Sequence, residues 1–156
     1  MLFRSLSGPL LAAVARSLFT TTVVYIAAMI GGVRLPGLAD TVVVYLLAAS
    51  FAAVASLWAI GVALRTRSVQ ASPLMQVVVF MSVFTSVAYT PRSALRGWLS
   101  HVADWNPVTF ILEASRTAQL SGITWSVMGP ALLAIAILVT LTGTFALTGL
   151  TRLGTR

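Results

Sequence analysis

The chain has 156 residues, of which 58% are hydrophobic and only 8% are charged. Ordinary soluble domains are about half apolar and about one quarter charged, so this composition excludes a soluble globular protein and indicates an integral membrane protein. The net charge of +7 comes from ten arginines against three acids. No basic run alternates with aromatic residues as nucleic-acid grooves require, so we expect the arginines to meet anionic headgroups at helix ends, with membrane lipid and no nucleic acid as a partner.

Missing residue types exclude several chemistries. Without cysteine or lysine, the chain has no thiol nucleophile, no thiolate metal site and no Walker-type phosphate loop. His101 is the single histidine, which excludes a histidine metal cluster. Glu113 with His101 or Asp104 could be drawn as an acid and base pair, but no nucleophile or metal set accompanies them. We therefore expect no enzyme, no cofactor and no metal, with any ATP hydrolysed by another chain.

The N-terminal residues, 1–16, suggest a short basic helix in the cytoplasm. Arg16 interrupts the apolar run and apolar sequence then resumes, so a cleaved signal peptide is the weaker interpretation. Residues 17–33 predict a first membrane helix, which at 1.5 Å per residue just crosses a hydrocarbon core of about 30 Å. Gly31 and Gly32 close this helix before a polar turn that contains Arg34.

Two further membrane helices are predicted over 41–64 and 72–90. The first carries no charge and places Ala48, Ala52 and Ser56 four residues apart, a small-residue face that suits close helix packing. A basic cytoplasmic turn with Arg65 and Arg67 separates the two segments. Pro73 is tolerated at the start of the next helix because its missing amide would be unpaired there.

Residues 91–125 form a different kind of sequence, which holds all acids except Asp40 and three of the four tryptophans. This composition predicts an interfacial region at the membrane surface instead of a simple membrane span. Residues 127–150 are again uncharged and predict a fourth membrane helix, with Ala136, Thr140, Thr144 and Thr148 at helical spacing as a second packing face.

The expected fold is therefore an all-α polytopic membrane protein in one domain. It has about four transmembrane helices, a short N-terminal cytoplasmic helix and an extracellular re-entrant hairpin. With this topology one membrane side holds six arginines and no acid, whereas the other holds four arginines and all three acids. The positive-inside rule places the first side, and with it both termini, in the cytoplasm.

The sequence after Tyr89 carries a recognisable pattern. An outer proline is followed by a short stretch with leucine and tryptophan, and then by Asn-Pro-x-Thr-aromatic-x-x-Glu-Ala-x-Arg. The matching residues here are Pro91, Leu95, Trp98, Asn106, Pro107, Thr109, Phe110, Glu113, Ala114 and Arg116. This pattern resembles the signature of ABC transporter type-2 permeases, particularly the daunorubicin-resistance type of drug exporter. Upstream, residues 7–16 resemble the family's cytoplasmic coupling segment and residues 32–36 its outer turn.

The resemblance implies a membrane-spanning permease subunit of an ATP-driven exporter in a bacterial cell membrane. It implies a separate P-loop ATPase partner, a homodimer or heterodimer of permease chains, and drug export with antibiotic resistance. Such permeases usually have six membrane helices, so the four segments would correspond to the third to sixth. The resemblance assigns ATPase coupling to Arg4, Leu10, Leu11 and Arg16, and closure of the outer pathway to the hairpin. The basic residues alone would also serve as cytoplasmic anchors.

Within the hairpin, Asn106 and Pro107 predict a helix start, because asparagine caps free amides and proline fits the first helical position. Gly122 predicts its end. Glu113 and Arg116, three residues apart, are expected to pair on one face and pin the hairpin, with direct substrate contact as the alternative. Asp104 would pair with Arg96 or cap a turn. The tryptophans are expected to anchor the interface, and His101 to be solvated, with pH sensing as its alternative.

A function from another class is also compatible with these residues. A non-transporting membrane scaffold, an assembly protein or a truncated permease remnant would retain packed helices without a coupling segment or an ATPase partner. The substrate remains open between drugs, antibiotics and glycolipids.

Overall fold

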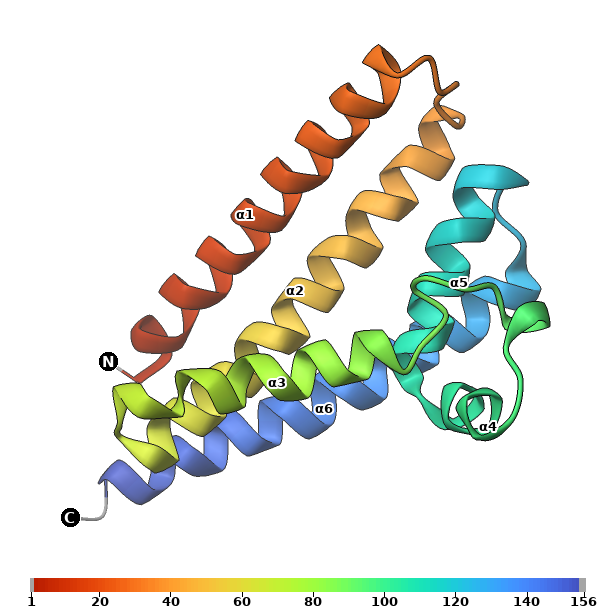
Figure 1. Cartoon of the computed structure of the whole chain (residues 1–156). Helices are drawn as coiled ribbons and strands as arrows, with labels where there is room; N and C mark the ends of the chain where they lie inside the picture. The colour runs from red at the N-terminus through yellow and green to blue at the C-terminus, as the bar shows by residue number, and fades with distance from the viewer. Residues whose placement is uncertain (1, 155–156) are drawn as a thin grey trace.

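All regular elements that the structure describes are helices. The computed structural model describes the backbone of residues 2–154 and the side chains of residues 7–68 and 70–151. Three of the helices, α1 (Leu2–Ile30), α2 (Leu38–Thr66) and α6 (Trp125–Gly154), each contain a stretch long and apolar enough to cross a membrane (Figure 1). The predicted all-α polytopic class is therefore confirmed.

Helix α1 replaces the two N-terminal segments that the sequence predicted. Instead of a cytoplasmic helix over 1–16 and a separate membrane helix, one helix runs through Arg16 without a break. Arginine is a good helix former, and the helix also continues through Pro9, its eighth residue. The helix ends where Gly32 adopts a φ of 79° and the Val33 amide donates to the Ala28 carbonyl at 3.0 Å.

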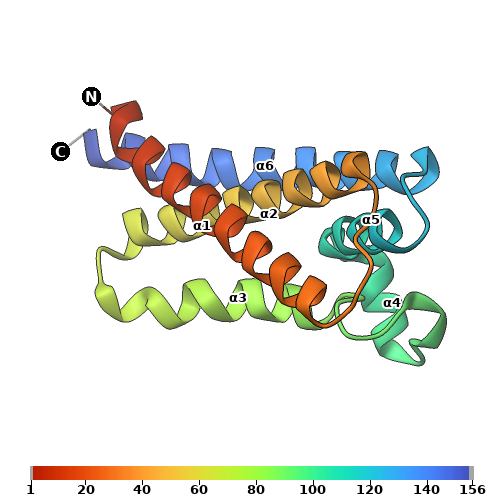
Figure 2. The ribbon, with the colours of Figure 1, turned by 90° about the horizontal axis from the view of Figure 1, so that it is seen from above.

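Helices α2 and α6 form the centre of the molecule. They lie side by side and run in the same direction, since Leu47 packs near Met128 towards one end and Gly61 faces Phe145 towards the other. Figure 2 shows α1 and α3 on the outside of this pair. The helices can run parallel because α3 and the hairpin return the chain to the starting side.

Helix α3 (Ser72–Phe84) is shorter than predicted. Its 13 residues span about 20 Å at 1.5 Å per residue, less than the hydrocarbon core of about 30 Å, whereas the sequence predicted a membrane helix over 72–90. The Ser86 amide donates to the Val83 carbonyl at 3.2 Å, three residues back instead of four, while the Ser82 carbonyl accepts from the Asn106 side chain at 2.6 Å, and the chain leaves the helix there. The described chain thus has three helices of spanning length where about four were expected.

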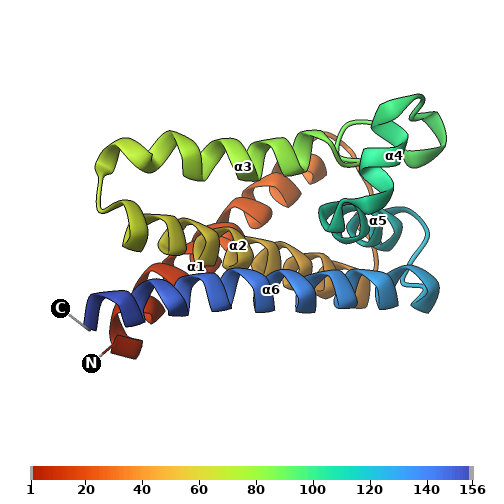
Figure 3. The same cartoon turned by 90° about the horizontal axis from the view of Figure 1, so that it is seen from below.

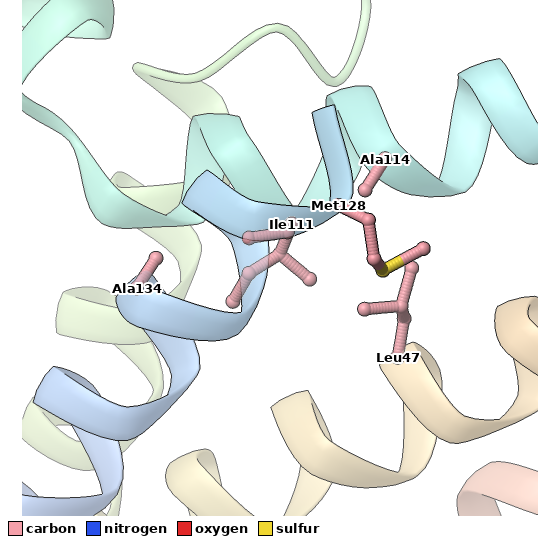
Figure 4. Packing of buried hydrophobic residues seen from close by; sticks show 6 residues of the cluster. Leu47, Ile111, Ala114, Met128 and Ala134 are labelled. Atoms are coloured by element: carbon pink, nitrogen blue, oxygen red, sulfur yellow. The ribbon is translucent and has the colours of Figure 1, made fainter. Parts of the chain in front are cut away.

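The hairpin consists of α4 (Trp98–Trp105) and α5 (Pro107–Leu120), preceded by a short 3-10 turn over Arg92–Ala94. Helix α5 packs inside the bundle. Its residues Ile111 and Ala114 join a buried cluster with Leu47 of α2 and Met128, Ala131 and Ala134 of α6 (Figure 4). Alanines at this contact let the three helix backbones approach closely.

The turns divide between two ends of the molecule. The start of α1, the turn after α2 and the end of α6 lie together, and α4 lies at the opposite end with the start of α6 (Figure 3). We call these the basic end and the hairpin end. The Arg65 to Ser68 turn therefore lies far from the Trp98 to Trp105 helix along the bundle.

Candidate functional site

Asn106 lies at the bend between α4 and α5 and bonds in two directions. Its side-chain oxygen accepts from the Val108 amide at 3.0 Å, which confirms the predicted helix cap. Its side-chain nitrogen donates to the Ser82 carbonyl at 2.6 Å and to the Thr85 hydroxyl at 3.1 Å. Asn106 therefore fixes the start of α5 to the end of α3, with Pro107 in the first helical position.

Arg116 binds backbone instead of an acid. The sequence predicted an ion pair with Glu113, but the Arg116 guanidinium donates to the Val87 carbonyl at 2.7 Å and to the Ala88 carbonyl at 3.3 Å. Val87 is fully buried, and an unpaired buried carbonyl would cost about 1–3 kcal/mol. Arg116 thus stabilises the turn that ends α3, from a position on the third turn of α5.

Arg92 is the cation that pairs with the hairpin acids. Its side chain lies 3.1 Å from the Glu113 carboxylate and 3.6 Å from Asp104, and its guanidinium lies 5.4 Å from the centre of the Phe110 ring. The expected pair between Asp104 and Arg96 is therefore replaced by one with Arg92. These contacts connect the turn before α4 to both hairpin helices. Any movement of α4 relative to α5 would therefore break the ion pairs of Arg92.

Two further contacts complete the hairpin end. The Asp40 carboxylate accepts from the Ile123 amide at 3.0 Å, which ties the turn after α5 to the start of α2. Gly122 in that turn has a φ of 83°, in agreement with the predicted helix end. Thr109 is fully buried, and its hydroxyl has no hydrogen-bond partner in the described part of the chain. Burial of an unpaired hydroxyl is unfavourable, so this α5 position is a weak point of the packing.

At the basic end, Arg65 joins α2 to α6 instead of standing free in solvent. It donates to the Gly61 carbonyl at 2.8 Å, to the Phe145 carbonyl at 2.6 Å and to the Thr148 hydroxyl at 2.7 Å. Its guanidinium also lies 3.7 Å above the Phe145 ring, whose other stacking partner is Trp58. Arg67 is exposed and ends α2 with a φ of 49°. The two arginines of the predicted cytoplasmic turn thus have different roles.

The family model of the ABC-2 type transporter matches residues 3–120, which is most of the chain. The chain belongs to the ABC-2 type transporter family. No curated protein and no solved structure matches the chain significantly. The match covers α1 to α5, including the whole hairpin.

Membership of the ABC-2 family makes the chain a permease subunit of an ABC transporter, without an ATPase site of its own. The family works with an ATPase subunit and forms permease dimers. Among the residues that the structure describes, no group of three or more histidine or acidic side chains gathers as a metal site would require.

The expected coupling residues of the ABC-2 permease are spread along α1. Leu10 is half-buried and Leu11 is 67% exposed near the start of the helix. The Arg4 side chain lies outside the described residues. Arg16 is exposed and borders a groove between α1 and α2, within the apolar stretch Ser7–Ile30. Arg16 therefore does not belong to a separate cytoplasmic helix.

Sequence reasoning did not predict two arginine contacts of the ABC-2 permease. The sequence gives no partner for Arg92, and it places Arg65 only in a basic cytoplasmic turn. Both contact residues from other elements, and a lone arginine gives no indication of which distant group it will meet. The remaining expected hairpin residues lie together on α5, with Thr109 facing the core and Phe110 packed against it.

Proposed function

We propose that this chain is the membrane-spanning subunit of an ATP-driven exporter in the bacterial cytoplasmic membrane. It works with a separate P-loop ATPase and moves an amphipathic or lipid-like substrate, such as a drug, an antibiotic or a glycolipid, out of the cell. The observation that carries the proposal is the family match over residues 3–120 in a chain with three helices of spanning length. Both termini lie in the cytoplasm, because the basic end holds most of the arginines.

The ATPase docks at the start of α1 in this proposal. Leu11 offers an exposed apolar side chain there, and Arg4 and Leu10 lie within two turns of it. A movement applied at this point reaches the membrane directly, because α1 continues as one helix from Leu2 to Ile30.

The hairpin acts as the outer gate. Asn106, Arg116 and Arg92 hold α4 and α5 to the end of α3 through hydrogen bonds and ion pairs that can break and re-form. Helix α5 also packs against α2 and α6, so a change in the angle between those helices would be felt by the hairpin. The Thr109 hydroxyl, which has no hydrogen-bond partner in the described part of the chain, supports a gate that repacks, because a second arrangement could give it a partner.

A second permease chain is proposed to pack against α6. Ala136, Thr140 and Thr144, which the sequence predicted as a packing face, lie exposed on this helix. Each threonine hydroxyl already donates to a carbonyl of its own helix. The face therefore consists of small side chains that need no hydrogen-bond partner from another helix. Such faces favour close contact between membrane helices.

Co-purification separates an exporter subunit from a membrane scaffold. The full chain is isolated from its native membranes in mild detergent, and partner chains that bind azido-ATP are photolabelled and quantified. An exporter subunit should retain a labelled ATPase. Replacing both Leu10 and Leu11 with alanine should reduce the amount retained by about tenfold, as truncation of interface anchors does.

The matched control is Leu120→Ala, which removes an equally apolar side chain, 80% exposed, at the hairpin end. It should leave ATPase retention unchanged. A chain that is well folded, by gel filtration and circular dichroism, and that retains no ATP-binding partner would support the scaffold instead.

A further inference from the structure

An arginine lies inside the first apolar helix. Arg16 is the only charged residue of the stretch Ser7–Ile30, nine residues after its start. At 1.5 Å per residue it lies about 14 Å from one end of the stretch and about 21 Å from the other. The last 18 residues of the stretch, which end at Ile30, span about 27 Å at 1.5 Å per residue, most of a hydrocarbon core of about 30 Å, and they include Arg16.

No acid of the chain is in a position to neutralise Arg16. The three acids are Asp40, which bonds Ile123, and Asp104 and Glu113, which bond Arg92. All three belong to the hairpin end. Arg16 has no ion pair or hydrogen bond among the residues that the structure describes. A charged side chain at membrane depth is costly when unpaired and marks a functional site by default.

The surroundings of Arg16 are polar on one side. It borders a groove of about 590 Å³ between α1 and α2, together with the hydroxyl residues Ser17, Thr20, Thr21 and Ser56 and with Pro9 and small alanines. These hydroxyls, like Arg16, have no side-chain hydrogen bond within the described chain. One guanidinium and several free hydroxyl donors therefore face the same space, with no acidic group among them.

This donor set fits an anion. A guanidinium binds phosphate or carboxylate with two parallel hydrogen bonds, and hydroxyls add further donors. The same helix exposes apolar side chains beyond the groove, among them Phe19, Val23 and Ile26. An acyl chain could lie along this face while its headgroup occupies the groove.

We propose that the groove between α1 and α2 binds the anionic, phosphate-type headgroup of an amphipathic molecule, with Arg16 as its main ligand. The inference rests on the proposed function and specifies its substrate class. The headgroup enters sideways from the lipid, and the groove leads it to the α1–α2 interface, where movement of α1 would act on it. The alanine at position 52 and Ser56, on the α2 side, leave room for the headgroup.

The test measures lipid binding by the isolated full chain, without an ATPase. The chain is reconstituted in phosphatidylcholine bilayers, and the bound fraction of spin-labelled phosphatidic acid is compared with that of spin-labelled phosphatidylcholine. The wild-type chain should prefer phosphatidic acid. Arg16→Gln should reduce this preference by about tenfold, the loss expected for a charge-assisted hydrogen bond. Thr20→Val should reduce it less, and Arg16→Lys should retain part of it.

The matched control is Arg67→Gln, which removes the same charge from an exposed position at the basic end. It should leave the preference for phosphatidic acid unchanged. An equal loss in both variants would mean that the anionic lipid is attracted by positive charge in general, and this would overturn the proposal. Unchanged binding in Arg16→Gln would also overturn it. Inorganic phosphate at matched concentration should not displace the lipid, and displacement would contradict an amphipathic ligand.

Failure of this test is distinguishable from failure of the proposed function. If Arg16→Gln binds lipid normally while the ATPase still co-purifies, only the headgroup site is wrong. If no ATPase is retained while Arg16 still selects phosphatidic acid, the site stands and the exporter assignment fails.

Discussion

Close packing at the basic end depends on single residues where α2 meets α6. A side chain at Gly61 would place its Cβ 2.2 Å from the Phe145 ring, a distance that no pair of carbon atoms tolerates. The absence of that side chain lets Phe145 stack between Trp58 and Arg65. At Gly149 a Cβ would lie 3.0 Å from Arg65. Two glycines thus make room for one aromatic ring and one guanidinium.

Gly61→Ala should therefore destabilise the protein, by about 1–3 kcal/mol, because overpacking forces the ring or the helix to shift. The measurement is unfolding in mixed detergent micelles, followed by circular dichroism. Gly143→Ala is the control, since a Cβ there meets no atom within 4 Å. Both substitutions gain helix propensity, so their difference reports the clash. Equal stability of the two variants would show that α2 and α6 do not pack at this distance.

Arg65 should matter for stability far more than Arg67. Arg65→Gln removes two of the bonds to α6 and the contact with the Phe145 ring, and we expect a loss of about 1–3 kcal/mol. Arg67→Gln removes the same charge from an exposed side chain and should change stability by less than about 0.5 kcal/mol. The two unfolding curves, recorded under identical conditions, decide the question. A large effect of both substitutions would mean that charge alone, through membrane orientation, is responsible.

Among the elements, the hairpin depends on bonds that cross between helices. Asn106 holds α5 to α3, Arg116 satisfies carbonyls after α3, and Arg92 bridges α4 and α5. The ion pair is partly exposed, with 39% of the Arg92 side chain accessible, so on its own it contributes little. The bonds of Asn106 and Arg116 to backbone carbonyls are the stronger restraints on the hairpin.

Two substitutions at position 106 separate the cap from the crosslink. Asn106→Asp keeps the oxygen that accepts from Val108 but loses the donor to Ser82, whereas Asn106→Ala loses both. We expect Asn106→Ala to cost about 0.5–2 kcal/mol and to raise hydrogen exchange in the first turn of α5. Asn106→Asp should protect that turn and raise exchange only near Ser82 and Thr85. Identical exchange in both variants would contradict a separate crosslink.

For the whole molecule, the sequence predicted those features that depend only on neighbouring residues in the chain. The uncharged run 41–64 lies within α2, and Asn106 with Pro107 begins α5 as predicted. Helix length and side-chain partners were not predicted where they depend on contacts between residues far apart in the sequence. The short α3 ends where the Asn106 side chain donates to the Ser82 carbonyl and the Ser86 amide bonds Val83 instead, and the partners of Arg65, Arg92 and Arg116 belong to other elements. Arg16 was misplaced because one charge ends a hydropathy window without ending a helix.

The two ends of the bundle have a predicted position relative to the membrane. If α2 and α6 cross it, the turn at Ser68 and the turn at Ser93 must face opposite aqueous compartments, because they lie at opposite ends of the bundle (Figure 1). Ser68 and Ser93 are both exposed, and the chain has no cysteine of its own. Single cysteines introduced at these positions therefore report on topology without a background signal.

Labelling of Ser68→Cys and Ser93→Cys with a membrane-impermeant maleimide is the most direct test. In intact cells, Ser93→Cys should react and Ser68→Cys should react only after lysis, in accord with the proposed outer hairpin and cytoplasmic basic end. Reaction of both cysteines from the same side would contradict the membrane-spanning bundle and the permease function that depends on it.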